Sequence, residues 1–196
     1  MKIWLPMIIY IAIQAITPGP NNLTCLYLGG SYGFHGVKKF LTASMLSLLI
    51  KVLLCGLLNV ALSELIPSVV KWLKWAGAAY MLYLAVTIIC SGWKEESGNS
   101  AVRTAASYKD GVILQLLNGK SWVAALSVFA VYVMPISTKV RTVLWVSLLF
   151  TAFMLCASLI WAVFGSALKS IISKHRKLFG IIMGASLIWC AVSAVM

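Results

Sequence analysis

The stretch AITPGPNN, residues 15–22, interrupts an otherwise apolar N-terminal segment. Pro18 and Pro20 have no backbone N–H, so each proline removes a helical hydrogen bond to the carbonyl four residues earlier. The residue before each proline is also disfavoured in helical geometry. The sequence therefore predicts that the first helix ends or kinks sharply near Thr17.

The composition of the chain is that of an integral membrane protein. Of its 196 residues, 62% are hydrophobic and 10% are charged, and the mean hydropathy is +0.98, whereas a soluble domain carries about 25% charged residues. Several apolar runs approach or exceed the roughly 20 residues that cross a hydrocarbon core. These runs are Ile3–Leu28, Phe40–Leu62, Trp72–Cys90, Gly111–Met134, Val140–Phe164 and Leu178–Val195. We therefore predict an all-α integral membrane protein with six transmembrane helices in a single transporter domain, residues 1–196.

The basic residues of the chain lie mainly between the apolar runs. The net charge is +12, from 16 Lys and Arg against 4 Asp and Glu. In these positions the charges set orientation and contact membrane lipid, so nucleic acid is not an expected partner. The odd-numbered linkers hold more Lys and Arg than the N-terminus and the even-numbered linkers. The positive-inside rule therefore places the odd linkers in the cytoplasm and both termini outside.

The longest polar linker, residues 93–107, divides the chain into halves at residues 1–92 and 108–196. The halves share two sequence echoes. KWLKWAG at 71–77 recurs as KHRKLFG at 174–180, and the segment from Gln14 aligns with the segment from Gln115 at a similar offset.

Three crossings in each half would invert the second copy relative to the first. The echoes therefore predict a 3+3 inverted repeat, a common plan of transporters whose substrate binds at broken helices near the midplane. Chance similarity between leucine-rich helices is the alternative.

The predicted break in the first helix implies a polar cavity beside residues 14–22. Backbone carbonyls without partners cost several kcal/mol each in hydrocarbon, so they must face protein or a water-filled cavity. We expect Asn21 or Asn22 to cap the second part of the helix, whose N-terminus suits a carboxylate, while the freed carbonyls suit an ammonium group. A zwitterionic amino acid matches both. The alternative is a proline kink without a ligand.

The fourth apolar run carries a polar counterpart to this break, formed by Gln115, Asn118, Gly119 and Lys120. Lys120 lies within the membrane by its position in the run, so it either binds a substrate carboxylate or snorkels to an interface. Lys51, in the middle of the second run, is expected to face the bundle interior. We expect its partner to be a carbonyl of the broken first helix.

The candidate substrate-binding residues come from these segments. They are Gln14, Thr17, Pro18, Gly19, Pro20, Asn21, Asn22, Lys51, Gln115, Asn118 and Lys120. We expect no catalytic residue, metal ligand or cofactor, because the five cysteines are scattered along the apolar runs and the two histidines stand apart in basic loops. The chain is therefore not expected to be an enzyme.

The motif TPGPNN in the first apolar run resembles that of the LysE/RhtB family of bacterial amino-acid exporters. The resemblance continues through SYGFHGVKKFL at 31–41, LKWAGAAYMLYLAV at 73–86 and LQLLNGKSW at 114–122. Within the family, the chain is most similar to the branch that exports cysteine and O-acetylserine. It departs from the family at Gly119, where the family often has proline, and at Lys51, which is unusual for it.

The resemblance implies efflux of a neutral amino acid or related metabolite across the bacterial inner membrane, by antiport with protons. A threonine- or homoserine-like substrate is an alternative within that function. A membrane thiol–disulfide electron carrier, and a small channel or scaffold, are alternatives of other classes. The sequence does not decide between a monomer and a homodimer.

Overall fold

The computed structural model describes residues 3–93 and 107–196, without the side chains of residues 60–71, 73 and 74. Its elements in chain order are α1 (Trp4–Ile16), α2 (Pro20–Tyr32), α3 (Phe34–Leu57), α4 (Asn59–Trp93), α5 (Tyr108–Leu117), α6 (Gly119–Ser127), the π-helix η1 (Val128–Val133), α7 (Val140–Ala167), α8 (Lys169–Lys174) and α9 (Arg176–Val195). Every element of the described residues is helical, as the composition predicts. The predicted linker at 93–107 lies outside the described residues except at its two ends.

Among the described residues, four helices are long and apolar enough to cross a membrane. These spans are Phe34–Leu57, Trp75–Trp93, Val140–Ala167 and Arg176–Val195. A helix satisfies its own backbone hydrogen bonds, which is why such apolar segments adopt this structure in lipid. A fifth candidate is the pair Tyr108–Leu117 and Gly119–Val133, bent by 58° at their junction.

The sixth predicted crossing depends on α1 and α2 together. α1 is apolar but only 13 residues long, which is too short to span about 30 Å of hydrocarbon alone. By length and composition, the described residues therefore hold four or five candidate spans rather than the six that the sequence predicts.

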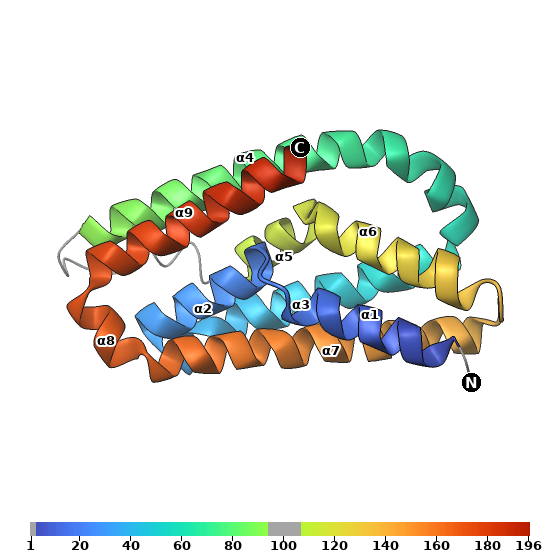
Figure 1. Ribbon diagram of the computed structural model, residues 1–196, viewed down its shortest axis with the longest axis horizontal. Helices are drawn as coiled ribbons and strands as arrows, with labels where there is room; N and C mark the ends of the chain where they lie inside the picture. The colour runs from blue at the N-terminus through green and yellow to red at the C-terminus, as the bar shows by residue number, and fades with distance from the viewer. Residues whose placement is uncertain (1–2, 94–106) are drawn as a thin grey trace.

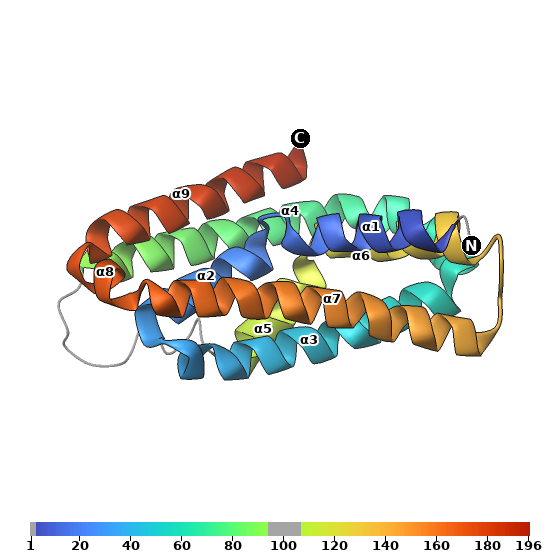
Figure 2. The same ribbon diagram turned by 60° about the horizontal axis from the view of Figure 1, so that its bottom comes forward.

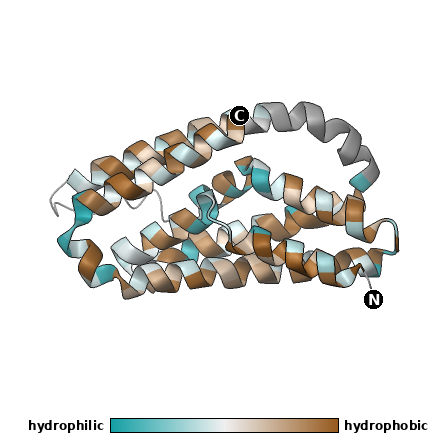
Figure 3. Cartoon of the chain, in the orientation of Figure 1, coloured by the Kyte–Doolittle hydropathy of each residue, from teal (hydrophilic) through white to brown (hydrophobic). Residues whose placement is uncertain are grey.

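The helices run along the long axis of the molecule (Figures 1 and 2). The N-terminus lies at one end, and the turn between α2 and α3 lies at the other end with α8 (Figure 1). Hydrophilic residues gather at α8, at one end of the bundle, and at the junction of α1 with α2, within the mostly hydrophobic helices (Figure 3). A polar centre within apolar helices is what a buried site in a membrane protein requires.

The pairs α2 with α7 and α3 with α5 make close backbone contacts across the two halves of the chain. In the pair of α2 with α7, a side chain at Gly165 would overlap the carbonyl of Leu26. In the pair of α3 with α5, a side chain at Gly111 would overlap the carbonyl of Phe40. Small residues allow this approach between membrane helices. Each half thus packs a part of its broken helix against a long helix of the other half.

α4 and α9 lie side by side along one flank of the bundle (Figures 1 and 2). Gly180 and Gly184 of α9 lie against the carbonyls of Ile88 and Ala85 of α4, and Gly77 lies against the carbonyl of Leu117. This agrees with close helix packing at glycines in membrane bundles.

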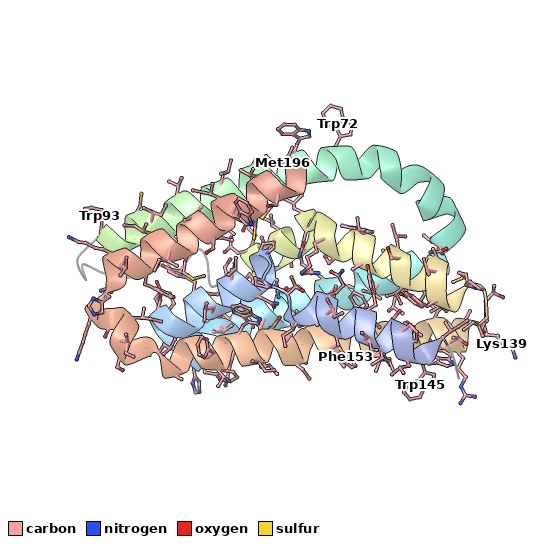
Figure 4. The ribbon with its side chains drawn as sticks, in the orientation of Figure 1. Trp72, Trp93, Lys139, Trp145, Phe153 and Met196 are labelled. Carbon is pink, nitrogen blue, oxygen red and sulfur yellow. The ribbon has the colours of Figure 1, made fainter. Side chains whose placement is uncertain are left out.

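Large aromatic side chains cover the outside of the bundle. Trp72, Trp93 and Trp145 point outward (Figure 4) and are 75%, 60% and 64% exposed. In water such a surface would promote association, whereas in a bilayer it contacts lipid and the interface. The exterior is therefore suited to a membrane.

Candidate functional site

The first break, defined as residues 17–19, separates α1 from α2. α1 ends at Ile16, where the N–H of Thr17 donates to the carbonyl of Ile13. Gly19 is extended, and α2 begins at Pro20. Proline suits the first position of a helix because its missing N–H has no helical partner there. The break predicted near Thr17 is confirmed.

The two asparagines after the break do not cap α2, so the predicted cap is wrong. Gly19 occupies the cap position because Pro20 starts the helix, and this places both asparagines inside its first turn. Asn22 Nδ2 instead donates back across the break, to the carbonyls of Ala15 at 2.8 Å and Thr17 at 3.3 Å. It therefore satisfies carbonyls that the end of α1 leaves without helical partners.

Asn21 joins three helices through its side-chain amide. Its Nδ2 donates to Ser158 Oγ of α7 at 2.9 Å, and its Oδ1 accepts from Ser44 Oγ of α3 at 2.6 Å. Ser158 Oγ also donates to Asn22 Oδ1 at 3.1 Å. Ser44 and Ser158 were not predicted as site residues, because serine is common within membrane helices and its partners lie far away in sequence.

The second break lies at Asn118, between α5 and α6. Asn118 leaves helical geometry with φ −75° and ψ 91°, and α6 begins at Gly119 without a proline. The indole N–H of Trp122 donates to the carbonyl of Leu116 at 2.8 Å. Ser121 Oγ donates to the carbonyl of Asn118 at 2.9 Å. The fourth apolar run is therefore broken as the first is, although the second break contains no proline.

Two lysines bind the breaks, each from the other half of the chain. Lys120 Nζ donates to the carbonyls of Gln14 at 3.2 Å and Thr17 at 3.3 Å. Lys51 Nζ donates to the carbonyl of Gln115 at 2.7 Å. Lys51 thus pairs with the second break rather than with the first, and this part of the prediction is wrong. We call this pair the crossed lysines.

The two crossed lysines differ in burial. Lys51 is 1% exposed, donates also to Ser121 Oγ at 2.5 Å, and lies 5.3 Å from the centre of the Trp122 ring. These partners are neutral oxygens and an aromatic face, which stabilise a cation without a carboxylate. Lys120 is only half-buried. Its ammonium points to the first break inside the bundle, so the snorkelling alternative does not describe its position.

A small inner cavity lies between the two breaks. Its volume is about 40 Å³, which is room for a few water molecules and far below the roughly 300 Å³ at which ligand pockets begin. The predicted residues that line it are Gln14, Thr17, Gly19, Asn21, Asn22, Gln115, Asn118 and Lys120. The structure also adds Ser121 and Ser158 to the lining.

A larger outer cavity of about 680 Å³ lies against the same breaks. It is bounded by α1, α2, α4, α5, α6 and α9, and Pro18 and Pro20 line it without reaching the inner cavity. Lys51 lines neither cavity.

The wall between the two cavities is made of residues that line both. They are Gln14, Thr17, Gly19, Asn118, Lys120 and Ala124. Among the described residues around the cavities, Lys120 is the single charged side chain. The site therefore presents one cation, backbone carbonyls and amide groups, which can bind both ends of a zwitterion.

Comparison with known proteins agrees with these observations. Residues 12–196 match the family described as LysE type translocator. The cysteine/O-acetylserine efflux protein of Escherichia coli O157:H7 is 30% identical over 183 residues, covering 93% of this chain and 92% of that protein. The proteins of the same description from Escherichia coli O139:H28 and Shigella flexneri serotype 5b are 31% and 30% identical with the same coverage. No solved structure matches the chain.

Proposed function

The chain belongs to the LysE type translocator family, and on this premise we propose that it is a secondary transporter that exports a small neutral amino acid. The proposed substrates are cysteine, O-acetylserine or a close relative such as threonine or homoserine. The named relatives are efflux proteins for the first two and match nearly the whole chain. The proposed location is the bacterial inner membrane.

The observation that carries the proposal is the bridge of Lys120 across the first break. Its ammonium takes the carbonyls of Gln14 and Thr17, which are the groups that suit the ammonium of an amino acid. A bound substrate would take these carbonyls and leave Lys120 to pair with the substrate carboxylate. The Lys120 side chain can thus close the site when it is empty and bind the substrate carboxylate when it is occupied.

Substrate binding on this proposal requires the wall to move. The inner cavity is too small for an amino acid, whereas the outer cavity is within the usual range for ligands. Displacement of Lys120 from the carbonyls would join the two cavities. The serines and asparagines around Asn21 would then face the polar side chain of the substrate. Met45, Leu48 and Met154 would face the substrate's methylene groups.

The proposed topology has six crossings in one domain, with α1 and α2 as one crossing and α5 to η1 as another. The contacts of α2 with α7 and of α5 with α3 support an inverted repeat, because each joins part of a broken helix to the first long helix of the other half. Figure 1 supports a shared side for the odd linkers, since the end of α2 lies with α8. Both termini are then proposed to lie outside.

Proton antiport is also part of the proposal. No carboxylate is present among the described residues that line either cavity. The titratable groups that hold the breaks are the ammonium groups of Lys51 and Lys120. We assign the proton carrier to Lys120, because it lines both cavities and Lys51 lines neither.

The test is counterflow in proteoliposomes that contain the purified protein. Labelled cysteine, O-acetylserine, threonine and lysine are each presented outside vesicles loaded with the unlabelled compound. We expect transient accumulation of a small neutral amino acid, accelerated by an imposed pH gradient, and no accumulation of lysine. Flux without counterflow would indicate a channel. Absence of flux together with activity lost on thiol alkylation would favour the electron carrier.

A further inference from the structure

The side-chain amide of Gln115 is buried at the end of the inner cavity that lies away from the wall. Gln115 is 2% exposed, and it lines the inner cavity but not the outer one. A buried amide is stable only when both its nitrogen and its oxygen have hydrogen-bond partners. The partners that each end has, and the one that it lacks, therefore indicate what the cavity is built to hold.

The nitrogen of this amide is bound by Ser121. Gln115 Nε2 donates to Ser121 Oγ at 3.3 Å. A serine hydroxyl has a single proton, and that of Ser121 is committed to the carbonyl of Asn118 at 2.9 Å. Ser121 can therefore only accept from the amide, so the nitrogen of Gln115 faces Ser121 and its oxygen faces Ser44.

The oxygen of the amide competes with Asn21 for its donor. Ser44 Oγ lies 2.6 Å from Asn21 Oδ1 and 3.4 Å from Gln115 Oε1. Hydrogen bonds between two oxygens are about 2.5–3.0 Å long, and Ser44 has one proton to give, so the shorter contact takes it. Gln115 Oε1 is therefore a buried acceptor that its protein neighbour satisfies only weakly.

Such an acceptor favours a ligand that carries a hydrogen-bond donor. The carbonyls of Gln14 and Thr17, which are proposed to take the substrate ammonium, belong to the wall that lines both cavities. Gln115 lines the inner cavity alone, so a substrate held at the wall by its ammonium would direct its side chain toward Gln115. A water molecule can supply the donor when no substrate is bound.

We propose that Gln115 is a specificity-determining residue, whose Oε1 accepts a hydrogen bond from a hydroxyl or thiol group on the substrate side chain. This inference rests on the proposed function and narrows its substrate class. Cysteine, serine, threonine and homoserine carry such a donor. O-acetylserine carries an ester, which has no proton to donate, and is a poorer substrate. A site built to bind a polar hydrogen discriminates strongly against an analogue that lacks it, because the partner is left unpaired.

The test is counterflow in proteoliposomes with serine, O-acetylserine and 2-aminobutyrate, in which a methyl group replaces the serine hydroxyl at nearly the same size. Ratios of initial rates at low concentration are compared within one preparation, so they do not depend on the amount of folded protein. The variants are Gln115→Met, which keeps the backbone carbonyl that binds Lys51, and Ser44→Ala. The control is Thr87→Val, whose hydroxyl donates to the carbonyl of Tyr83 in its own helix and lines neither cavity.

We expect the wild type and the control to prefer serine over 2-aminobutyrate and over O-acetylserine by about 10-fold or more. Gln115→Met should lose most of the preference for serine over 2-aminobutyrate. Ser44→Ala should keep it, because the acceptor on Gln115 remains. Loss of the preference in Ser44→Ala with its retention in Gln115→Met would overturn the assignment to Gln115.

The wild type alone separates this inference from the proposed function. Equal counterflow of serine and 2-aminobutyrate would overturn the role of Gln115 while leaving the export of small neutral amino acids intact. Absence of counterflow with every amino acid presented would overturn the proposed function, and this inference with it.

Discussion

The two broken helices reach similar shapes by different means. The first break is imposed by Pro18 and Pro20, which remove backbone hydrogen bonds whatever surrounds them. The second break contains no proline, and its carbonyls at Gln115 and Leu116 are bound by side chains. The first break is therefore a property of the backbone, whereas the second depends on its partners.

The same contrast holds for the crossed lysines. Lys51 is buried at the break that depends on partners, so we assign it a structural role. Lys120 lies in the wall between two cavities, at the break that the prolines maintain. It can leave the carbonyls of the first break without that break closing. The comparison thus separates a lysine that holds a helix from a lysine that can move.

The strongest test of the comparison removes the prolines. Pro18→Ala with Pro20→Ala should restore a continuous first helix, because both missing hydrogen bonds become available. Export should fall at least about 100-fold, since positioning errors near a site cost that much, while the amount of protein in the membrane stays close to wild type. Initial efflux rates and quantitative immunoblots measure the two quantities. Unchanged export would show that the prolines do not create the site.

The second test addresses the mobile lysine. Lys120→Met should raise the KM for the exported amino acid about 10-fold or more, because a charge-assisted hydrogen bond to the substrate is lost. Membrane insertion and melting temperature should change little, since the wall contacts two cavities that can hydrate the carbonyls. Lys39→Met is the control. A normal KM would remove Lys120 from the substrate site.

The third test addresses the structural lysine. Lys51→Met leaves the buried carbonyl of Gln115 without its donor, at a cost of about 2 kcal/mol. The melting temperature should fall by about 5 °C, and the KM should change less than in Lys120→Met. Thermal unfolding in detergent measures the first quantity. A melting temperature at or above that of the wild type would mean that removing a buried charge offsets the lost contact.

The smallest effect is expected where the two breaks differ in sequence. Gly119→Pro would give the second break a proline at the first position of α6, where no helical N–H is required. The extended geometry of Asn118 suits a residue before proline. We expect export within about threefold of wild type and a slightly higher melting temperature, because proline restricts the unfolded chain. A large loss of export would show that the second break must straighten during transport.

The sequence predicts features that depend on neighbouring residues, such as helix ends, but it does not predict contacts between distant segments. The end of α1 follows from Pro18 and Pro20, and the long helices follow from the length and composition of the apolar runs. The predicted cap of α2 is wrong because Pro20 is the first helical residue, so that both asparagines lie inside the helix. The partner of Lys51 lies 64 residues away along the chain. Only the packing of α3 against α5 decides that contact.

The wall between the cavities has a consequence for the membrane as an electrical barrier. A pathway through a bilayer threatens to leak sodium and potassium and to discharge the membrane potential. On the proposed mechanism, the protonated ammonium of Lys120 lies beside both cavities, whether it binds backbone carbonyls or a solute. A positive charge there repels inorganic cations. The cell can then discard a metabolite at the cost of protons alone, without a leak of sodium or potassium ions.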